Sequence, residues 1–481
     1  MKTLLKKTEI INHDLPSVYL IRRNSDLSPA RFTDEEMVYV RSRIEKGDDF
    51  IQIRKLDKYI CLVVSDESRP FFDQLELLRR FAPKLHSIVK EHDHAELMVA
   101  DIINDPELVF ALVEGLILYN YRFEKYRKQS DSTNAFPSSI SIYCPYLQED
   151  DLSRLEVLTQ AVYLARDLVN EPLSHLNAGG LAERLKSMGS DSGFSVEVMD
   201  KSRIESLKMG GLLAVNRGSV DPPSFSILEW KPDKYVNERP FVLIGKGIVF
   251  DTGGLSLKPT ANSMDYMKSD MAGAAAVAGI MFAISQNKLP VHVIGLIPAT
   301  DNRPGGNAFV PGDVITMYDG TTVEVMNTDA EGRLLLADAL SWAKQYDPCL
   351  VIDIATLTGS AAAAVGSQGS VVMQKSAGEW YDSLEESGYY THERLVKFPL
   401  WEEYAEMLKS DIADIKNLGG KEAGAITAGK FLERFISFPW LHIDIAGPAY
   451  LNSEDNYRKK GGTAVGVRLL FDFFVRYSLK R

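Results

Sequence analysis

In the second half of the chain, short runs of almost unbroken apolar residues alternate with longer stretches of helical periodicity. The apolar runs cover residues 241–245, 291–298 and 350–355, and such runs are typical of strands that are covered on both faces. Apolar residues recur at helical spacing at 271–286 and 334–345. This alternation predicts an α/β fold in which helices cover both sides of a central sheet.

Other segments carry shorter patterns of the same kinds. Residues 59–64 and 95–103 have the composition of strands, and apolar residues at 72–89 recur at the spacing of a helix. Residues 314–325 have the pattern of a β-hairpin with a tight Asp-Gly turn. None of the residues before position 150 forms a cluster that is typical of a catalytic site.

A chain of 481 residues is too long for one compact core, so we expect at least two domains. A helical pattern lies at 150–168, and the part of the chain that follows it is richer in the apolar runs of buried strands. We place a smaller N-terminal α/β domain at 1–150 and a linker helix at 151–170. A larger C-terminal α/β domain at 171–481 would contain the mixed central sheet flanked by helices.

The composition narrows the classes of function. A formal net charge of -12 argues against binding nucleic acid or an anionic membrane over a broad surface. The three cysteines are far apart and form no disulfide framework, which fits a reducing compartment. No signal peptide is evident, and no run approaches the ~20 apolar residues of a membrane span. We therefore expect a cytoplasmic protein that does not bind a membrane.

The segment 325–334 contains two carboxylates, Asp329 and Glu331, followed by Arg333 and an apolar helical stretch. If this segment is extended, the three side chains project from the same side. A bound divalent cation would offset the repulsion between the two acids, and Arg333 would add an anion-binding group. The alternative is an ordinary loop before a helix, where acidic residues are favoured beside the first-turn amides.

A second group of polar residues follows the apolar run at 241–245. It contains Lys246, Asp251, Lys258 and Asp270 among several glycines, which allow a ligand to approach the backbone closely. The glycines lack the spacing of a GxGxxG motif or of a phosphate-binding loop. Each lysine or aspartate taken alone fits a surface role, so the prediction of a site depends on the whole group.

Three aspartates and one glutamate from these two segments could together hold two divalent cations. A lysine beside such a centre can act as a neutral-amine ligand, because a cation lowers its pKa. Oxygen ligands alone favour magnesium or manganese, whereas one nitrogen ligand moves the preference towards zinc, manganese or cobalt. Two metal ions about 3.5–4 Å apart can activate a bridging water and polarise a carbonyl group.

These segments resemble the leucyl aminopeptidase family, also called the cytosol aminopeptidase family. Residues 327–334 match its eight-residue signature letter for letter, and the resemblance extends from about residue 165 to the C-terminus. It includes residues 249–258, 353–359 and 442–447. The N-terminal domain matches no motif of the family, and an assembly or regulatory role is our hypothesis for it.

The resemblance implies that the C-terminal domain is a catalytic peptidase domain with two divalent metal ions. One metal ion would be held by Lys246, Asp251, Asp270 and Glu331. The other would be held by Asp251, Asp329 and Glu331, so that two of the carboxylates bridge the pair. The family uses zinc, with manganese, magnesium or cobalt accepted at the more exchangeable position.

The resemblance also implies the reaction. The enzyme would be a leucyl aminopeptidase, a hydrolase that removes the N-terminal residue from peptides and amino-acid amides by attack of a metal-bridging water. Lys258 would stabilise the negative charge of the tetrahedral intermediate. Arg333 would hold a bicarbonate that relays the proton, and the alternative is a structural ion pair between Arg333 and the acids of the cluster.

Five further residues match positions that line the side-chain pocket of the family: Met267, Thr356, Leu357, Gly359 and Ala446. A methionine among small residues suits apolar side chains. We therefore expect a preference for leucine or other apolar N-terminal residues. For each of these residues taken alone, plain core packing is the alternative.

Assembly as a homohexamer and peptide substrates with a free N-terminus follow from the same resemblance. One rival function is a nucleic-acid-binding regulator, because some bacterial relatives bind DNA. The acidic balance and the absence of a Lys/Arg-dense N-terminal segment count against it. The other rival is a metal-dependent hydrolase such as a phosphatase, which would share the acids but would not need a free α-amine on its substrate.

Overall fold

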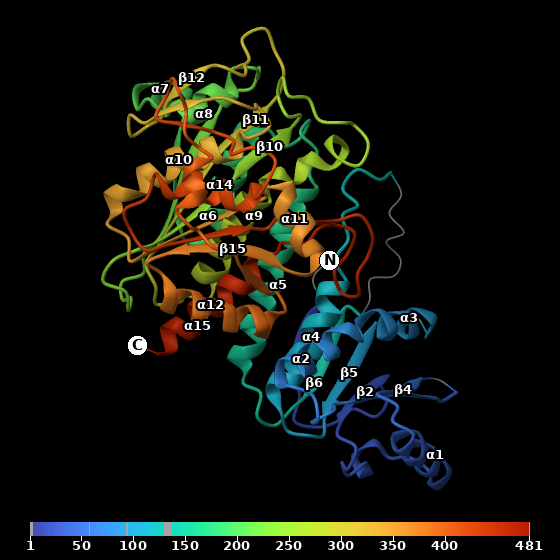
Figure 1. The fold of residues 1–481 in the computed structure, drawn as a ribbon. Coiled ribbons are helices and arrows are strands. Elements are labelled where there is room, and N and C mark those ends of the chain that lie inside the picture. Colours follow the sequence, from blue (N-terminus) through green and yellow to red (C-terminus); the bar gives the residue numbers. More distant parts are fainter. Residues whose placement is uncertain (1–2, 57, 93–94, 129–136, 481) are drawn as a thin grey trace. The chain divides into compact units, whose positions relative to one another are not determined.

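A computed structural model describes residues 3–56, 58–92, 95–128 and 137–480 of the chain (Figure 1). The chain divides into two compact units. They consist of Met1–Gln160 with Ser453–Lys459, and of Ala161–Asn452 with Lys460–Arg481. Every residue that the sequence places in a candidate site belongs to the second unit.

The first unit contains a six-stranded sheet. Its strands are β1 (Leu4–Lys7), β2 (Ser17–Ile21), β3 (Phe50–Arg54), β4 (Tyr59–Val64), β5 (Glu96–Asp101) and β6 (Ser139–Tyr143). They lie in the order β1-β6-β5-β2-β4-β3 and are parallel except for the β3–β4 pair. Strands β4 and β5 confirm the strands that were expected at 59–64 and 95–103.

The helices of the first unit are α1 (Asp34–Glu45), α2 (Phe71–Arg80), α3 (Ala82–His92) and α4 (Pro106–Tyr119). The helical pattern at 72–89 is therefore divided between two helices. The break comes at Phe81, shortly before Pro83, which is tolerated in the first turn of a helix but not in its interior. A further helix, α5 (Glu149–Asn170), covers the predicted helical pattern at 150–168, and the two units divide within it.

The second unit contains a nine-stranded sheet. Its strands are β7 (Ser195–Met199), β8 (Ser224–Trp230), β9 (Phe241–Gly245), β10 (Gly247–Asp251), β11 (Val293–Asn302), β14 (Leu350–Ala355), β15 (Ser370–Lys375), β16 (Leu395–Lys397) and β18 (Trp440–Asp444). They lie in the order β16-β15-β18-β14-β9-β11-β8-β7, with β10 paired to β11. The central strands β18, β14, β9 and β11 are parallel, whereas β15 and β8 run antiparallel to their inner neighbours. The expected mixed sheet is confirmed.

Two small sheets complete the second unit. They consist of β12 (Val314–Thr316), β13 (Thr322–Glu324) and β17 (Ile415–Lys416), and of β19 (Tyr450–Leu451) and β20 (Gly461–Gly462). Strands β12 and β13 are antiparallel and adjacent in the chain, which confirms the hairpin expected at 314–325.

The helices of the second unit are α6 (Ala178–Ser192), α7 (Lys201–Ser206), α8 (Gly210–Asn216), α9 (Ala272–Gln286), α10 (Gly332–Ala343), α11 (Gly359–Val365), α12 (Gly378–Thr391), α13 (Glu403–Glu406), α14 (Gly424–Glu433) and α15 (Val467–Leu479). Helices α8, α10 and α14 share a core with Val242 and Ile244 of β9. Phe241 of the same strand instead packs against Phe473 and Phe474 of α15. Because alternate residues of a strand face opposite sides, helices cover both faces of the sheet (Figure 1).

One stretch, Met264–Gln286, is long and apolar enough to cross a membrane by length and composition, contrary to our expectation for the sequence. It consists of the 3₁₀ helix η2 (Met264–Met271) followed by α9. Its most apolar window is 89% buried inside the protein. Helix α9 packs on β8, β9, β11 and β14, which is the position of a core helix.

Candidate metal centre

The polar residues of the candidate site follow the carboxyl ends of neighbouring strands. Lys246 comes directly after β9, Asp251 is the last residue of β10, and Thr356 comes directly after β14. Strands β9 and β14 are parallel neighbours, and both β9 and β10 pair in parallel with β11. Parallel strands end at the same edge of a sheet, so the fold brings these residues together.

The segment that carries Asp329 and Glu331 has a different backbone from the extended one that we considered. Residues Asn327–Ala330 form a turn, closed by a hydrogen bond from Ala330 N to Asn327 O of 3.3 Å. Glu331 has helical dihedral angles (φ -76°, ψ -40°) and stands at the start of α10. The two carboxylates therefore converge because a turn leads into a helix, and not because a strand alternates.

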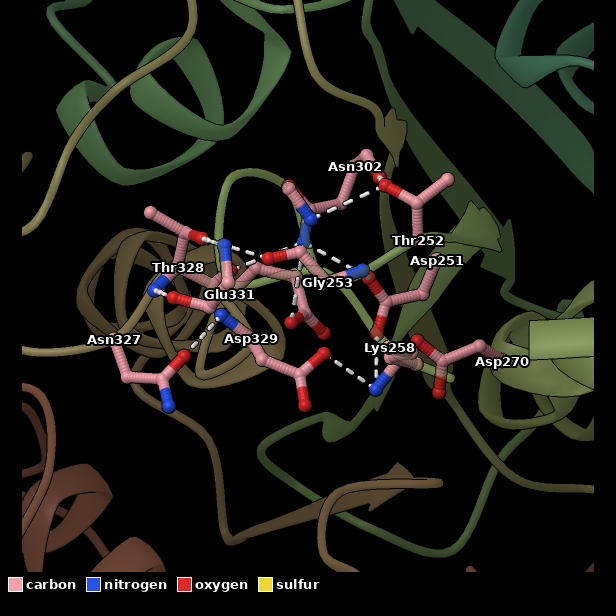
Figure 2. Close-up of polar contacts among 12 residues, drawn as sticks. Asp251, Thr252, Gly253, Lys258, Asp270, Asn302, Asn327, Thr328, Asp329 and Glu331 are labelled. Carbon is pink, nitrogen blue, oxygen red and sulfur yellow. Dashed lines mark hydrogen bonds and ion pairs between the residues drawn. The ribbon is translucent and has the colours of Figure 1, made fainter. Parts of the chain in front are cut away.

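Glu331 occupies the N-cap position of α10, but its side chain makes no capping hydrogen bond. The alternative interpretation, in which the acids serve the first-turn amides of the helix, is therefore not supported for this residue. Asp329, Glu331 and Asp251 each offer a carboxylate oxygen within 4.8 Å of the others. These three acids face one another (Figure 2).

Two lysines lie between the acids. The Lys246 ammonium is 2.9 Å from Asp270 Oδ1 and 3.1 Å from Glu331 Oε1. The structure thus brings Lys246 and Asp270 into the same cluster as the signature segment.

Lys258 approaches the cluster from the other side. Its ammonium is 2.9 Å from Asp251 Oδ2 and 2.5 Å from Asp329 Oδ1 (Figure 2). The structure therefore brings into one cluster all six residues that we expected as metal ligands or as the charge-stabilising lysine. Four carboxylates facing two ammonium groups leave a net negative charge in the cluster.

Burial and mutual repulsion disfavour the charged forms of the acids. Burial, and then the neighbouring Glu331 and Asp270, raise the pKa of Asp251 well above its usual range. Burial raises the pKa of Asp270 to about 6, against the opposing effect of Lys246. Burial alone would lower the pKa of Lys246, but the neighbouring carboxylates raise it above its usual value. A divalent cation would reverse this situation by favouring ionised carboxylates and a neutral amine.

The donor set fits a pair of divalent cations. Asp270 Oδ2 is buried and has no hydrogen-bond partner among the residues that the structure describes, so an acceptor oxygen is left for a cation. Close approach also depends on a glycine: a Cβ atom on Gly332 would stand 2.4 Å from Cε of Lys246. Carboxylate oxygens with one amine nitrogen suit zinc or manganese.

Two residues that the sequence analysis missed hold the acids in place. Asn302 Nδ2 donates to Asp251 Oδ1 (2.8 Å) and to the carbonyl oxygen of Thr328 (3.0 Å). Thr328 Oγ1 donates to the carbonyl oxygen of Gly253 (2.6 Å) and accepts from Ser256 N (2.8 Å), which joins the two loops (Figure 2). The available signal was that Asn302 ends a buried strand at the same edge of the sheet as Asp251.

Arg333 is buried and lines the same cavity as the acids. Its Nη1 donates to the carbonyl oxygen of Asn417 (2.7 Å), whereas Nε has no hydrogen-bond partner in the described residues. No carboxylate of the described residues forms an ion pair with it, so the alternative of a structural ion pair is not supported. Burial lowers the pKa of Arg333 to about 10.

The acids, lysines and Arg333 line one cavity of about 450 Å³. All five residues expected in a side-chain pocket also line it: Met267, Thr356, Leu357, Gly359 and Ala446. The sequence analysis missed Tyr266 and Tyr450, whose stacked rings lie 6.1 Å apart in the cavity wall, and the exposed Lys421. The cavity therefore combines an acidic cluster with an apolar wall.

Thr356 contacts the charged cluster directly. Its carbonyl oxygen accepts a hydrogen bond from the Lys246 ammonium (2.8 Å), and its hydroxyl donates to Asp270 Oδ1 (2.7 Å). Thr356 is therefore more than a pocket-lining residue.

Comparison with known proteins shows the family to which the chain belongs. The family described as "Cytosol aminopeptidase family, catalytic domain" matches residues 163–471. A probable cytosol aminopeptidase of Chlorobium limicola is 46% identical over 387 residues, which cover 76% of this chain and 75% of the relative. One from Chlorobaculum tepidum is 46% identical over 389 residues, 77% of this chain and 76% of the relative.

Two solved structures share the fold. A mutant of tomato leucine aminopeptidase has a TM-score of 0.86 and 27% identity, covering 99% of this chain and 97% of that chain. The bottromycin maturation enzyme BotP in complex with Mn has a TM-score of 0.83 and 28% identity, covering 96% of this chain and 100% of that chain. The chain therefore belongs to the cytosol aminopeptidase family and is a hydrolase of the aminopeptidase class.

Proposed function

We propose that the protein is a dinuclear metallo-aminopeptidase that removes leucine or another apolar residue from the N-terminus of peptides and amino-acid amides. The observation that carries the proposal is the convergence of four carboxylates and two lysines in a cavity with an apolar wall. The acids suit two cations, and the wall suits an apolar side chain.

Lys246, Asp251, Asp270 and Glu331 would hold one metal ion, and Asp251, Asp329 and Glu331 would hold the other. Zinc is the proposed metal, with manganese, magnesium or cobalt accepted at the more exchangeable position. When bound, the two ions would supply an activated water and polarise the scissile carbonyl group. The manganese complex of the structural neighbour BotP supports a site for divalent metal ions.

Lys258 is placed to stabilise charge that develops on the substrate. Its ammonium lies in the cavity beside Asp251 and Asp329. As the scissile carbonyl carbon becomes tetrahedral, this ammonium would donate a hydrogen bond to the negatively charged carbonyl oxygen. Such a contact contributes about 3 kcal/mol to transition-state stabilisation.

Arg333 is placed to bind a small anion, and we propose bicarbonate. Its guanidinium lines the cavity with Nε still available, and guanidinium groups recognise planar anions of this type. When held by Arg333, the anion would supply a proton relay between the attacking water and the leaving amine. This relay explains why the site needs no histidine or additional glutamate as a general base.

When bound, the metal ions would also supply a ligand position for the free α-amine of the substrate, and this selection gives the test. The purified enzyme with zinc or manganese should hydrolyse leucinamide but not its N-acetylated form. Cleavage of both compounds at similar rates would contradict the proposal. Hydrolysis of p-nitrophenyl phosphate in place of leucinamide would favour a phosphatase, and salt-dependent retention of DNA in a filter-binding assay would favour a regulator.

We further propose that the protein assembles as a homohexamer in the cytoplasm. The resemblance to the family supports this assembly. Light scattering on the purified protein tests it, and a mass of one or two subunits would contradict it.

A further inference from the structure

Strands β14 and β18 carry polar residues for which the proposed reaction has no role. The two strands are parallel neighbours, and Ala355 at the end of β14 pairs with Asp444 at the end of β18. Asp444 therefore stands beside the start of the loop 356–358, which follows β14 and lines the cavity. Its side chain is only 1% exposed.

Asp444 holds this loop through both of its carboxylate oxygens. Oδ1 accepts hydrogen bonds from Leu357 N (3.0 Å) and Ala446 N (3.1 Å), and Oδ2 accepts one from Thr358 Oγ1 (2.7 Å). Thr358 Oγ1 in turn accepts from Ala361 N (3.0 Å) and so caps α11. One buried carboxylate thus fixes two consecutive residues of the loop and Ala446, which also lines the cavity.

The residue that precedes these two in the loop is Thr356, which contacts the Lys246 ammonium and Asp270 Oδ1. Asp444 is therefore connected through the loop 356–358 to Lys246 and Asp270. Neither Asp329 nor Lys258 receives a contact from this loop in the described residues.

A buried contact between a histidine and an aspartate accompanies Asp444 on the same face of the sheet. His442 and Asp444 are two residues apart in β18, and side chains at this spacing in a strand point to the same side. His442 Nδ1 lies 2.5 Å from Asp353 Oδ1, and Trp440 Nε1 donates to Asp353 Oδ2 (2.6 Å). Burial alone would lower the pKa of His442, but Asp353 raises it above its usual value. A cationic His442 would reduce the cost of the buried Asp444 carboxylate.

We propose that Asp444 is a positioning residue for the Lys246–Asp270 half of the metal centre. It acts through the loop 356–358, and it sets the affinity of the metal position that contains Lys246 and Asp270. This inference rests on the proposed function for the assignment of metal ligands. It concerns one of the two metal positions only, because the loop contacts ligands of one position only.

Metal binding to the purified protein, measured by competition with a chromophoric chelator of zinc, tests the inference without measuring activity. The wild type should bind two zinc ions per chain, and fewer would count against the proposed function itself. Asp444→Ala should lower the affinity for one of the two zinc ions by roughly 10- to 100-fold and leave the affinity for the other unchanged. Thr356→Val should lower the affinity for the same zinc ion, whereas Thr356→Ser should bind both ions like the wild type.

Asp338 provides a matched control. It is also a buried aspartate that accepts two backbone hydrogen bonds, from Leu212 N (3.0 Å) and Tyr318 N (2.9 Å), but it does not line the cavity. Asp338→Ala should lower the unfolding midpoint and keep both zinc affinities. If Asp444→Ala bound both ions like the wild type, or if Asp338→Ala lost the same ion, the inference would be wrong.

If Asp444→Ala did not fold, Thr358→Val would replace it, because this change removes the hydroxyl that joins Asp444 to the loop while the volume is kept. Thr358→Val should again lower the affinity for one of the two zinc ions only. Unchanged affinity for both ions in Thr358→Val and in Thr356→Val would overturn the inference.

Discussion

The two lysines of the metal centre have different surroundings. Lys246 is 2% exposed and lies between Asp270 and Glu331, whereas the side chain of Lys258 is partly exposed and borders the cavity. A buried lysine among ligands suits binding to a metal ion. A lysine at the cavity suits contact with a substrate whose charge changes during the reaction.

This difference makes Lys258→Ala informative. We expect kcat to fall by roughly 10²- to 10³-fold, with KM and zinc content almost unchanged, because the lost interaction is made mainly in the transition state. Steady-state kinetics on leucine p-nitroanilide and metal analysis measure the three quantities. Lys421→Ala, which removes another lysine of the same cavity, is the control and should keep kcat. Near-normal turnover in Lys258→Ala would exclude the role that we give it.

Asp338 predicts a pH dependence of stability that is separate from catalysis. Burial raises the pKa of Asp338 to about 7. A carboxyl group whose pKa is raised by folding contributes stability at low pH, and this contribution is lost as the pH rises through the folded-state pKa. Between pH 5 and pH 8, in round numbers, the free energy of unfolding of the wild type should therefore fall relative to that of Asp338→Asn.

Urea unfolding of both proteins at several pH values measures this difference. Over this window the relative change can reach about 3 kcal/mol, since about two pH units separate pH 5 from the folded-state pKa and each unit corresponds to about 1.4 kcal/mol. Parallel curves for the two proteins would show that Asp338 does not titrate in this range.

At the scale of elements, the start of α10 brings the signature segment close to β9. Gly332 is the first residue of α10, and a Cβ atom there would stand 2.4 Å from Cε and 2.7 Å from Nζ of Lys246. The contact involves the end of a flexible side chain, so the helix can remain in place while the ammonium moves.

Gly332→Ala should therefore lower zinc affinity by roughly tenfold while the unfolding midpoint stays the same or rises, because alanine favours a helix. Gly378→Ala is a matched control. Gly378 is also the first residue of a helix, α12, but has no atoms within 4 Å of its potential Cβ. Zinc titration and thermal unfolding of both variants test the prediction, and equal zinc affinity in the two would contradict it.

The sequence predicts the elements best where burial decides them. The apolar runs at 241–245 and 350–355 coincide with β9 and β14, because strands covered on both faces leave few polar positions. The periodicity at 72–89 did not show the break at Phe81, because the two helices keep similar apolar spacing on either side of it. Local turn chemistry around Pro83 was the missing signal.

The candidate site could be predicted only in part for a related reason. Asp251, Asp329 and Glu331 stand out because acids are uncommon beside buried strands and helices. Asn302 and Asp444 each end a strand, and their partners come from other strands that the sequence does not place beside them. Long-range strand order, which no local pattern encodes, determines those contacts.

At the scale of the whole molecule, the metal centre stores electrostatic repulsion that bound cations would relieve. Zinc should therefore raise the unfolding midpoint of the second unit. A free zinc concentration about 100 times the dissociation constant stabilises a protein by ~2.7 kcal/mol. Glu331→Ala removes the carboxylate that we propose for both metal positions, so it should lose zinc, activity and this stabilisation together.

Differential scanning calorimetry with chelator and with added zinc tests the wild type and Glu331→Ala side by side. Zinc or manganese should also restore activity to chelated wild-type enzyme. A zinc-dependent rise of equal size in both proteins would place the bound zinc at another site.

The short segment Ser453–Lys459 has a consequence for any attempt to dissect the protein. It belongs to the first unit, where Tyr457 donates to Glu76 Oε2 (3.0 Å) and Glu454 accepts from Tyr119 (2.9 Å). A fragment starting at Ala161 would keep this segment but lose both partners, and its flanking residues Asn452 and Tyr450 border the cavity. Weak activity of such a fragment would therefore not show that the first unit regulates the enzyme, because disturbed residues at the cavity would have the same effect.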